Sequence, residues 1–203
     1  MKQRPIQSFM LGVLLFLPLS FALWYLGAVV HLAPLTWLTE QLLQLSFPQS
    51  VLWLKLDSST LVLASNFGID AQGAVVSPPV SDDLMGFHLN PLIYTYSLPL
   101  LFALILATPS SNKWQQLIWA SLIWLPIAAF SMFFSVLKVL CFDVGTAFQQ
   151  QQGLSAWSLD AIALAYQMGT LILPMIAPLV IWMALNRVFL LSLAPQLHRI
   201  LAH

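Results

Sequence analysis

The residues most able to do chemistry are polar side chains placed within long apolar runs. The chain has 203 residues, 60% of them hydrophobic and 7% charged, whereas soluble domains have about 25% charged residues. Within the runs, polar side chains recur at helical spacing, which places each group on one face of a helix. Polar groups inside a membrane span usually face protein and often carry function. The candidate partner-binding residues are Asn90, Tyr94, Ser97, Ser135, Lys138, Asp160, Gln167 and Thr170.

Two interpretations of these polar faces remain open. In the first, the side chains join helices to one another by hydrogen bonds, or reach to the membrane surface. In the second, they line a polar cleft that opens outward and receives a partner's helix or a substrate tail. Lys138 paired with Asp160 or Asp143 is the ion pair that would test the second interpretation.

Catalytic chemistry is a weaker prediction. The single cysteine, Cys141, could serve a membrane thiol peptidase only if a base and an oxyanion stabiliser converged on it. His88 or His31 could provide the base, but Arg187 would lie at the far end of the last span, ~40 Å away by helix rise. Two histidines without further ligands do not make a convincing metal site. The sequence therefore predicts no catalytic residue, no metal and no cofactor.

The elements that position the polar faces are four apolar stretches. A transmembrane helix needs about 20 residues to cross the ~30 Å hydrocarbon layer. The predicted spans are residues 8–32, 91–109, 114–140 and 161–189. The first begins like a secretory signal, but its apolar run is too long for one and no clear cleavage site follows, so an uncleaved anchor is expected. The predicted fold is an α-helical integral membrane protein with four transmembrane helices.

The distribution of charge predicts the orientation of these helices. Basic residues flank the first span, separate the second from the third and follow the fourth: Lys2, Arg4, Lys113, Arg187 and Arg199. All seven acidic residues fall in the other loops or at their edges. Basic loops face the cytoplasm, which predicts a multi-pass protein of the bacterial inner membrane with both termini inside. The net charge is zero, so no nucleic-acid partner is indicated and the lipid bilayer is the expected environment.

Between the first two spans the pattern changes to a small β-rich insertion. Residues 35–46 have the spacing of a short helix lying on the outer membrane face. A hairpin is expected from 51–57 and 61–64, with 84–89 as a third strand and 71–83 as an irregular loop. Alternation in the first strand predicts that Trp53, Lys55 and Asp57 share one face and Leu52, Leu54 and Leu56 the other. The predicted division is an anchor (1–34), an extracytoplasmic module (35–89) and a three-helix bundle with a short tail (90–203).

Two sequence blocks carry a resemblance to a known family. The first runs from Asn90 to Pro99, and the second from Ala161 to Arg187 includes Tyr166-Gln167, Leu173-Pro174 and Leu185-Asn186-Arg187. They are similar to the exosortase H-associated membrane proteins, small bacterial proteins encoded beside a membrane transpeptidase-like sorting enzyme. The resemblance implies a non-enzymatic accessory that binds the exosortase-like enzyme, the hydrophobic C-terminal anchor of its substrates, or both. It transfers no catalytic residue.

Three other functions stay open on the sequence. The protein could serve a different cell-envelope assembly, for example as a pilin accessory protein. It could be a thiol peptidase that uses Cys141, or a subunit of a small transporter or channel. The identity of its partners would separate the first of these from the sorting function.

Overall fold

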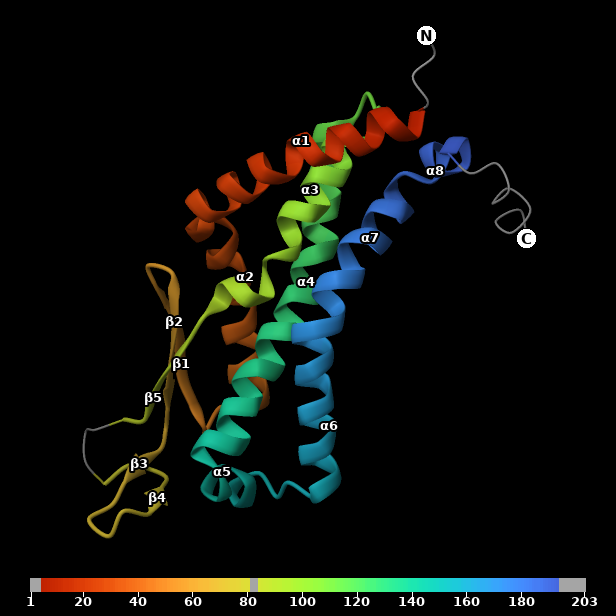
Figure 1. The fold of residues 1–203 in the computed structure, drawn as a ribbon. Helices are drawn as coiled ribbons and strands as arrows, with labels where there is room; N and C mark the ends of the chain where they lie inside the picture. Colours follow the sequence, from red (N-terminus) through yellow and green to blue (C-terminus); the bar gives the residue numbers. More distant parts are fainter. Residues whose placement is uncertain (1–4, 81–83, 194–203) are drawn as a thin grey trace. The chain divides into compact units, whose positions relative to one another are not determined.

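The computed structural model describes residues 5–80 and 84–193 (Figure 1). Five residues used in the charge argument lie outside these ranges, namely Lys2, Arg4, Asp82, Asp83 and Arg199. The chain divides into two compact units. One unit contains residues 5–27, 96–126 and 175–193. The other contains residues 28–95 and 127–174.

Within residues 5–80 and 84–193, three helical segments are long and apolar enough to cross a membrane, rather than the predicted four: Ile6–Leu26, Lys113–Val144 and Ala156–Leu185. The predicted span 91–109 instead forms a 3₁₀ turn, η1 (Pro91–Tyr94), followed by α3 (Ser97–Ala107). With 11 residues, α3 is about 16 Å long by helix rise. A fourth full-length transmembrane helix is therefore not confirmed, because the proline-bearing start of this stretch does not form a regular α-helix.

The first predicted span also ends earlier than expected. α1 (Pro5–Leu26) stops at Gly27, and α2 (Ala28–Ser46) follows directly. A side chain at residue 27 would place its Cβ 2.9 Å from the carbonyl oxygen of Leu23, so this junction requires glycine. The helix expected at 35–46 is correspondingly longer and begins at Ala28.

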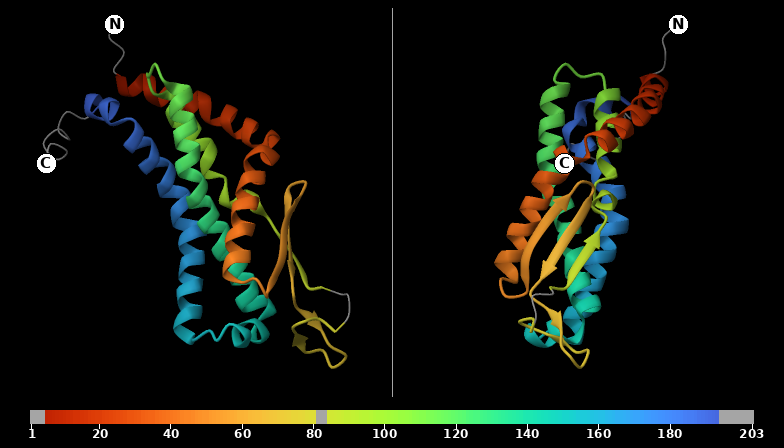
Figure 2. Two further views of the ribbon diagram at one scale, coloured as in Figure 1. Left: turned by 180° about the vertical axis from the view of Figure 1, so that it is seen from behind. Right: turned by 90° about the vertical axis from the view of Figure 1, so that its left-hand side faces the viewer.

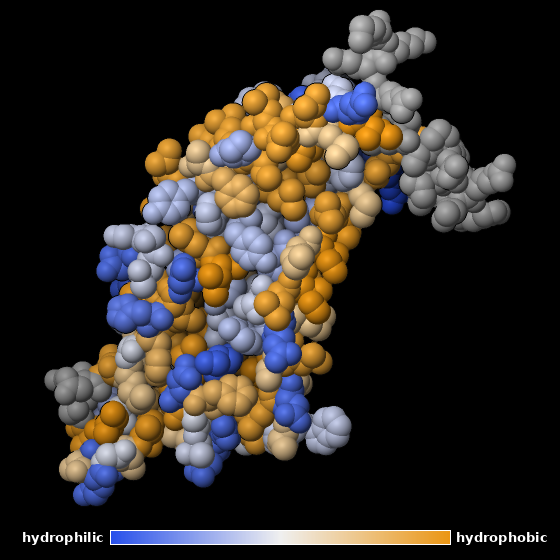
Figure 3. Space-filling model, viewed as in Figure 1, coloured by the Kyte–Doolittle hydropathy of each residue, from blue (hydrophilic) through white to orange (hydrophobic). Residues whose placement is uncertain are grey.

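In the first unit, α1 packs against α3. Gly12 permits their close approach, since a Cβ there would lie 3.1 Å from that of Ala107. α4 (Lys113–Val139) is joined to α3 by Trp124, whose indole Nε1 donates to Ser97 Oγ at 3.0 Å. α7 (Leu173–Leu185) and α8 (Arg187–Leu193) complete the unit. Figure 3 shows apolar side chains covering α1, as expected for a helix whose surface faces lipid.

In the second unit, the predicted three-stranded sheet is present. β1 (Val51–Asp57), β2 (Thr60–Ser65) and β5 (Gly86–Leu89) are antiparallel in the order β1-β2-β5, and α2 lies against β1 (Figure 2). The predicted alternation fails at Leu52, because the register shifts between Val51 and Trp53. This bulge leaves Leu52 39% exposed while Val51 and Leu54 are buried, as an extra residue reverses the faces of a strand.

The segment expected to be an irregular loop contains a second small sheet. β3 (Gly68–Ile69) pairs with β4 (Val75–Val76). The turn between them is held by Asp70, whose carboxylate accepts backbone N–H groups from Gln72 at 2.9 Å and Ala74 at 2.8 Å. Gly73 has a φ of +83°, a conformation that glycine adopts easily. Hydrogen bonds from one aspartate thus order a segment that hydrophobic alternation alone did not predict.

The strand module packs against α2 and against the helical segment that follows α4. α4 continues into a π-helical turn, η2 (Leu140–Val144), and then α5 (Thr146–Gln151). Phe148 of α5 is fully buried against Phe47 and Phe67, with ring centroids 5.6 and 6.2 Å apart. The chain returns through α6 (Ala156–Gln167) and a second π-helical turn, η3 (Met168–Ile172). The contacts of Phe148 with Phe47 and Phe67 give the strand module a core that its few strands could not form alone.

Candidate functional site

Tyr94 and Ser135 are two predicted residues that the structure brings together. Tyr94 is buried at the end of η1, Ser135 is buried on α4, and their hydroxyl groups are hydrogen-bonded. Each hydroxyl thereby satisfies the other in a setting where an unpaired polar group would be costly. The pair ties η1 to α4, which fits the structural interpretation of these two positions.

Lys138 pairs with Asp143, one of the two partners proposed for it. Its Nζ lies 3.3 Å from Asp143 Oδ1, and both side chains are partly exposed. Exposed ion pairs contribute little stability. Asp160, the other proposed partner, is exposed near the start of α6.

Ser97 and Thr170 are also used within the protein. Ser97 accepts the Trp124 indole hydrogen bond. Thr170 donates to the backbone oxygen of Tyr166 at 2.8 Å, within its own helix. Such a bond satisfies the threonine hydroxyl without a second helix. Both hydroxyl groups therefore already have a hydrogen-bond partner within the chain.

Asn90 and Gln167 are exposed. The Asn90 side chain caps η1 by accepting from Leu92 N at 3.1 Å. Gln167 lies within the candidate span Ala156–Leu185, and its side-chain amide makes no hydrogen bond with any residue that the structure describes. Leu164 and Leu171, on either side along the helix, are 59% and 64% exposed. An unpaired carboxamide therefore lies within an apolar surface of a helix that is long and apolar enough to cross a membrane.

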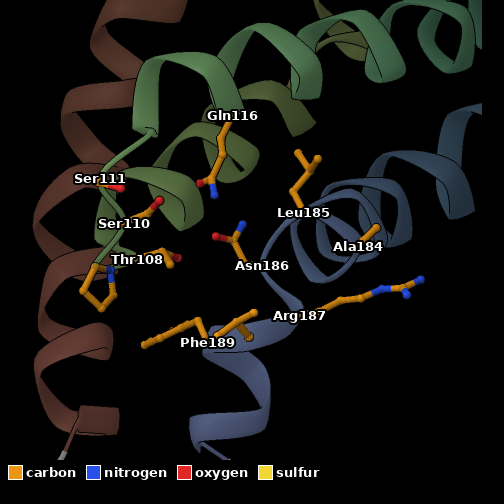
Figure 4. A pocket seen from close by; sticks show the side chains of 11 residues that line it. Thr108, Ser110, Ser111, Gln116, Ala184, Leu185, Asn186, Arg187 and Phe189 are labelled. Carbon is orange, nitrogen blue, oxygen red and sulfur yellow. The ribbon is translucent and has the colours of Figure 1, made fainter. Parts of the chain in front are cut away.

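A polar pocket of about 610 Å³ lies in the first unit, at residues that the candidate-site prediction did not include. It is formed where α3 ends, α4 begins and α7 gives way to α8 (Figure 4). The side chains of Gln116 and Asn186 point toward one another across it. The polar and charged lining residues are Thr108, Ser110, Ser111, Gln116, Asn186 and Arg187. The signal in the sequence is the group of polar residues just outside the ends of two spans, whereas the predicted candidate residues lie on helix faces.

Cys141 is fully buried. Its backbone oxygen accepts a hydrogen bond from Gln149 Nε2 at 2.8 Å. A substrate carbonyl could reach the thiol only if the surrounding helices opened. The position is that of a packed small side chain.

The two helical blocks singled out in the sequence, η1 with α3 and α6 with α7, now have defined polar contacts. The sequence profile of the exosortase H-associated membrane proteins matches residues 3–189, which include both blocks and the strand module. The chain belongs to this family. No curated protein and no solved structure gives a significant match.

Membership in the exosortase H-associated family identifies a membrane protein associated with an exosortase. This agrees with the three long apolar helices and confirms the resemblance drawn from the two sequence blocks. The match extends over the strand module as well as the helices.

Proposed function

We propose that the protein is a non-enzymatic accessory of an exosortase-type sorting system, and that it binds the sorting enzyme or the hydrophobic C-terminal anchor of its substrates. The observation that carries this proposal is Gln167, an unpaired carboxamide between the exposed residues Leu164 and Leu171. Apolar surface alone gives little drive for helix association in lipid, whereas a hydrogen bond from a glutamine adds specific attraction. A partner helix with an apolar face and a polar group at the depth of Gln167 would both pack against this surface and hydrogen-bond to the carboxamide.

Asn90 and Asp160 extend the proposed docking surface. Both are exposed in the same unit as Gln167. Tyr94, Ser97, Ser135 and Thr170 have partners within the chain, and Lys138 is paired with Asp143. These five already have partners within the chain and are not expected to contact a partner protein first.

The buried state of Cys141 supports an accessory role over a peptidase. Nucleophilic catalysis needs an accessible thiol with a base in hydrogen-bonding reach, and Cys141 has no exposed surface. We expect Cys141→Ser to leave sorting in cells unchanged. Loss of sorting in a stably folded Cys141→Ser protein would favour the enzyme alternative.

The strand module is proposed to lie outside the cytoplasm of a bacterial inner-membrane protein with both termini inside. β5 forms one edge of the sheet. In the proposed orientation an extended peptide outside the cytoplasm could pair with this edge. The module would then meet either the substrate's recognition segment or the outward active site of the enzyme.

The test is co-purification from native membranes. A C-terminally tagged protein is extracted in mild detergent, and its membrane partners are identified by mass spectrometry. The sorting enzyme or tail-anchored precursors are expected with the unmodified protein. Gln167→Leu is expected to lower their yield about three- to tenfold, because it removes one intramembrane hydrogen bond and its specificity.

Gln150→Leu is the matched control, since Gln150 is an exposed glutamine on α5 outside the candidate spans. Unchanged partner yield with Gln167→Leu would remove Gln167 from the docking surface. Recovery of envelope proteins unrelated to sorting would instead favour the assembly-factor alternative.

A further inference from the structure

We propose that the pocket between the start of α4 and the end of α7 binds the headgroup of a glycerophospholipid. The pocket residues 108–111 directly precede the candidate span that begins at Lys113. On the other side, residues 186–189 directly follow the span that ends at Leu185. The ends of two spans mark the membrane–water boundary, which is the depth of lipid headgroups.

The interior of the pocket is held in place by a chain of hydrogen bonds. Asn186 is 5% exposed, and its Nδ2 donates to the backbone oxygen of Trp182 at 3.1 Å. The Trp182 indole donates to Thr108 Oγ1 at 2.9 Å, and Thr108 donates in turn to Leu104 O at 2.8 Å. The end of α3 and the end of α7 are thus linked, so the pocket does not depend on a ligand to form.

Two carboxamide oxygens in this interior lack partners. Oε1 of Gln116 is buried without a hydrogen bond. Oδ1 of Asn186 accepts none from the part of the chain that the structure describes, although this atom is not fully buried. Figure 4 shows both side chains directed into the space between them. Unpaired acceptors of this kind favour a ligand that brings O–H or N–H donors.

Charge and apolar surface agree with a lipid headgroup. No carboxylate is among the pocket's lining residues, and the charged one is Arg187, whose guanidinium points away from Gln116 and Asn186 (Figure 4). A cation beside the pocket attracts a phosphate, while the hydroxyls or ammonium of the headgroup reach Gln116 and Asn186. Among the lining residues Val188 is 85% exposed, and on α7, before the lining residues in the chain, Leu179 and Met183 are exposed one turn apart, at 44% and 41%. This apolar track suits an acyl chain.

The size of the pocket is sufficient for such a group. Small-molecule sites commonly occupy about 300–1,000 Å³, and this pocket measures about 610 Å³. A basic side chain of a protein partner fits less well, because the lining includes the cation Arg187 and no carboxylate.

The experiment is native mass spectrometry of the full-length protein in detergent with added phosphatidylglycerol, phosphatidylethanolamine or phosphatidylcholine. Retention of phosphatidylglycerol or phosphatidylethanolamine over phosphatidylcholine is expected, because the choline group has no donor for the two carboxamides. Gln116→Leu and Asn186→Leu are each expected to weaken retention about tenfold. Gln115→Leu, an exposed neighbour outside the lining, should match the unmodified protein.

A second measurement separates lost binding from lost folding. Gln116→Leu removes a buried unpaired oxygen, so its thermal midpoint without lipid should equal or exceed that of the unmodified protein. Its gain in midpoint on adding phosphatidylglycerol or phosphatidylethanolamine should fall to that seen with phosphatidylcholine. Equal retention by Gln116→Leu and the unmodified protein would overturn the proposal.

Two further arms identify the source of the ligand. Displacement of the lipid by millimolar inorganic phosphate would show a site for the anion alone and would overturn the lipid assignment. Cross-linking of a photoreactive residue placed at Ser111 to a protein, rather than to lipid, would do the same. The cross-link is made in native membranes, whereas the lipid-retention and thermal-midpoint measurements use purified protein, so their outcome is independent of whether an exosortase is bound.

Discussion

At the scale of single residues, polar groups at membrane depth divide by whether the chain already satisfies them. In the first unit two indole groups donate hydrogen bonds to hydroxyl groups, Trp124 to Ser97 and Trp182 to Thr108. Gln167 differs because its surroundings are apolar and exposed. Satisfied groups stabilise helix contacts, and the unsatisfied group is the one available for a partner.

The Tyr94–Ser135 contact predicts strong coupling between two substitutions. Tyr94→Phe and Ser135→Ala should each lower the free energy of unfolding by about 1 kcal/mol. The double variant should lose little more than either single one, because removing both hydroxyls leaves no unpaired group. Unfolding in bicelles, followed as a double-mutant cycle, measures this. Ser121→Ala is the control, since Ser121 donates only to Leu117 O in its own helix; fully additive effects would contradict the contact.

At the scale of elements, two side chains of α2 form hydrogen bonds with the backbone of β1. Glu40 Oε1 accepts from the backbone N–H of Leu54 at 3.2 Å, and Gln44 Nε2 donates to Leu52 O at 3.3 Å. These side chains occupy the outer edge of β1, next to its bulge. A covered edge does not pair with other strands, so β5 is left as the open edge of this sheet.

Glu40→Ala is therefore expected to loosen β1 selectively. Loss of the acceptor should leave Leu54 N–H unpaired and speed hydrogen exchange in residues 51–57 about fivefold, as expected for about 1 kcal/mol. Glu40→Gln keeps an acceptor and should change exchange less. Gln41→Ala, on the neighbouring position of α2, serves as the control. Exchange that is unchanged in 51–57 with Glu40→Ala would show that the edge is held by other contacts.

At the scale of the whole molecule, the short segment Pro91–Ala107 decides the topology. Both termini can lie in the cytoplasm only if the chain crosses the membrane an even number of times, and three helices are clearly long enough. The four residues of η1 and the 11 of α3 extend about 25 Å, slightly less than the hydrocarbon layer. Short spans are accommodated by local thinning of the bilayer or by helix association.

We predict that Pro91–Ala107 crosses, and that residues 59 and 111 lie on opposite sides. In a Cys141→Ser background, Ser59→Cys should react with an impermeant maleimide in intact spheroplasts, since Ser59 is exposed in the β1–β2 turn. Ser111→Cys should react only after permeabilisation. Labelling of both positions from outside would show that α3 enters the membrane without crossing it.

Sequence patterns correctly predicted the long helices, the three strands and the family, because hydropathy and strand alternation are local properties. They did not predict the helix junction at Gly27 or the bulge at Leu52. The junction depends on a steric contact with Leu23. The bulge depends on the register between β1 and β2, which exists only once the two strands are paired. The β3–β4 turn was missed because its order comes from the carboxylate of Asp70 rather than from hydrophobic alternation.

For the candidate site, the sequence by itself predicts which polar residues lie at membrane depth, since depth follows from position along a predicted span. Only the tertiary structure decided which of them are available. Tyr94 and Ser135 lie 41 residues apart in the chain, and no periodicity could show that their hydroxyls satisfy each other. Gln116 and Asn186 likewise face one pocket from different helices. Hydrogen-bond satisfaction depends on distances between elements, and folding alone fixes those distances.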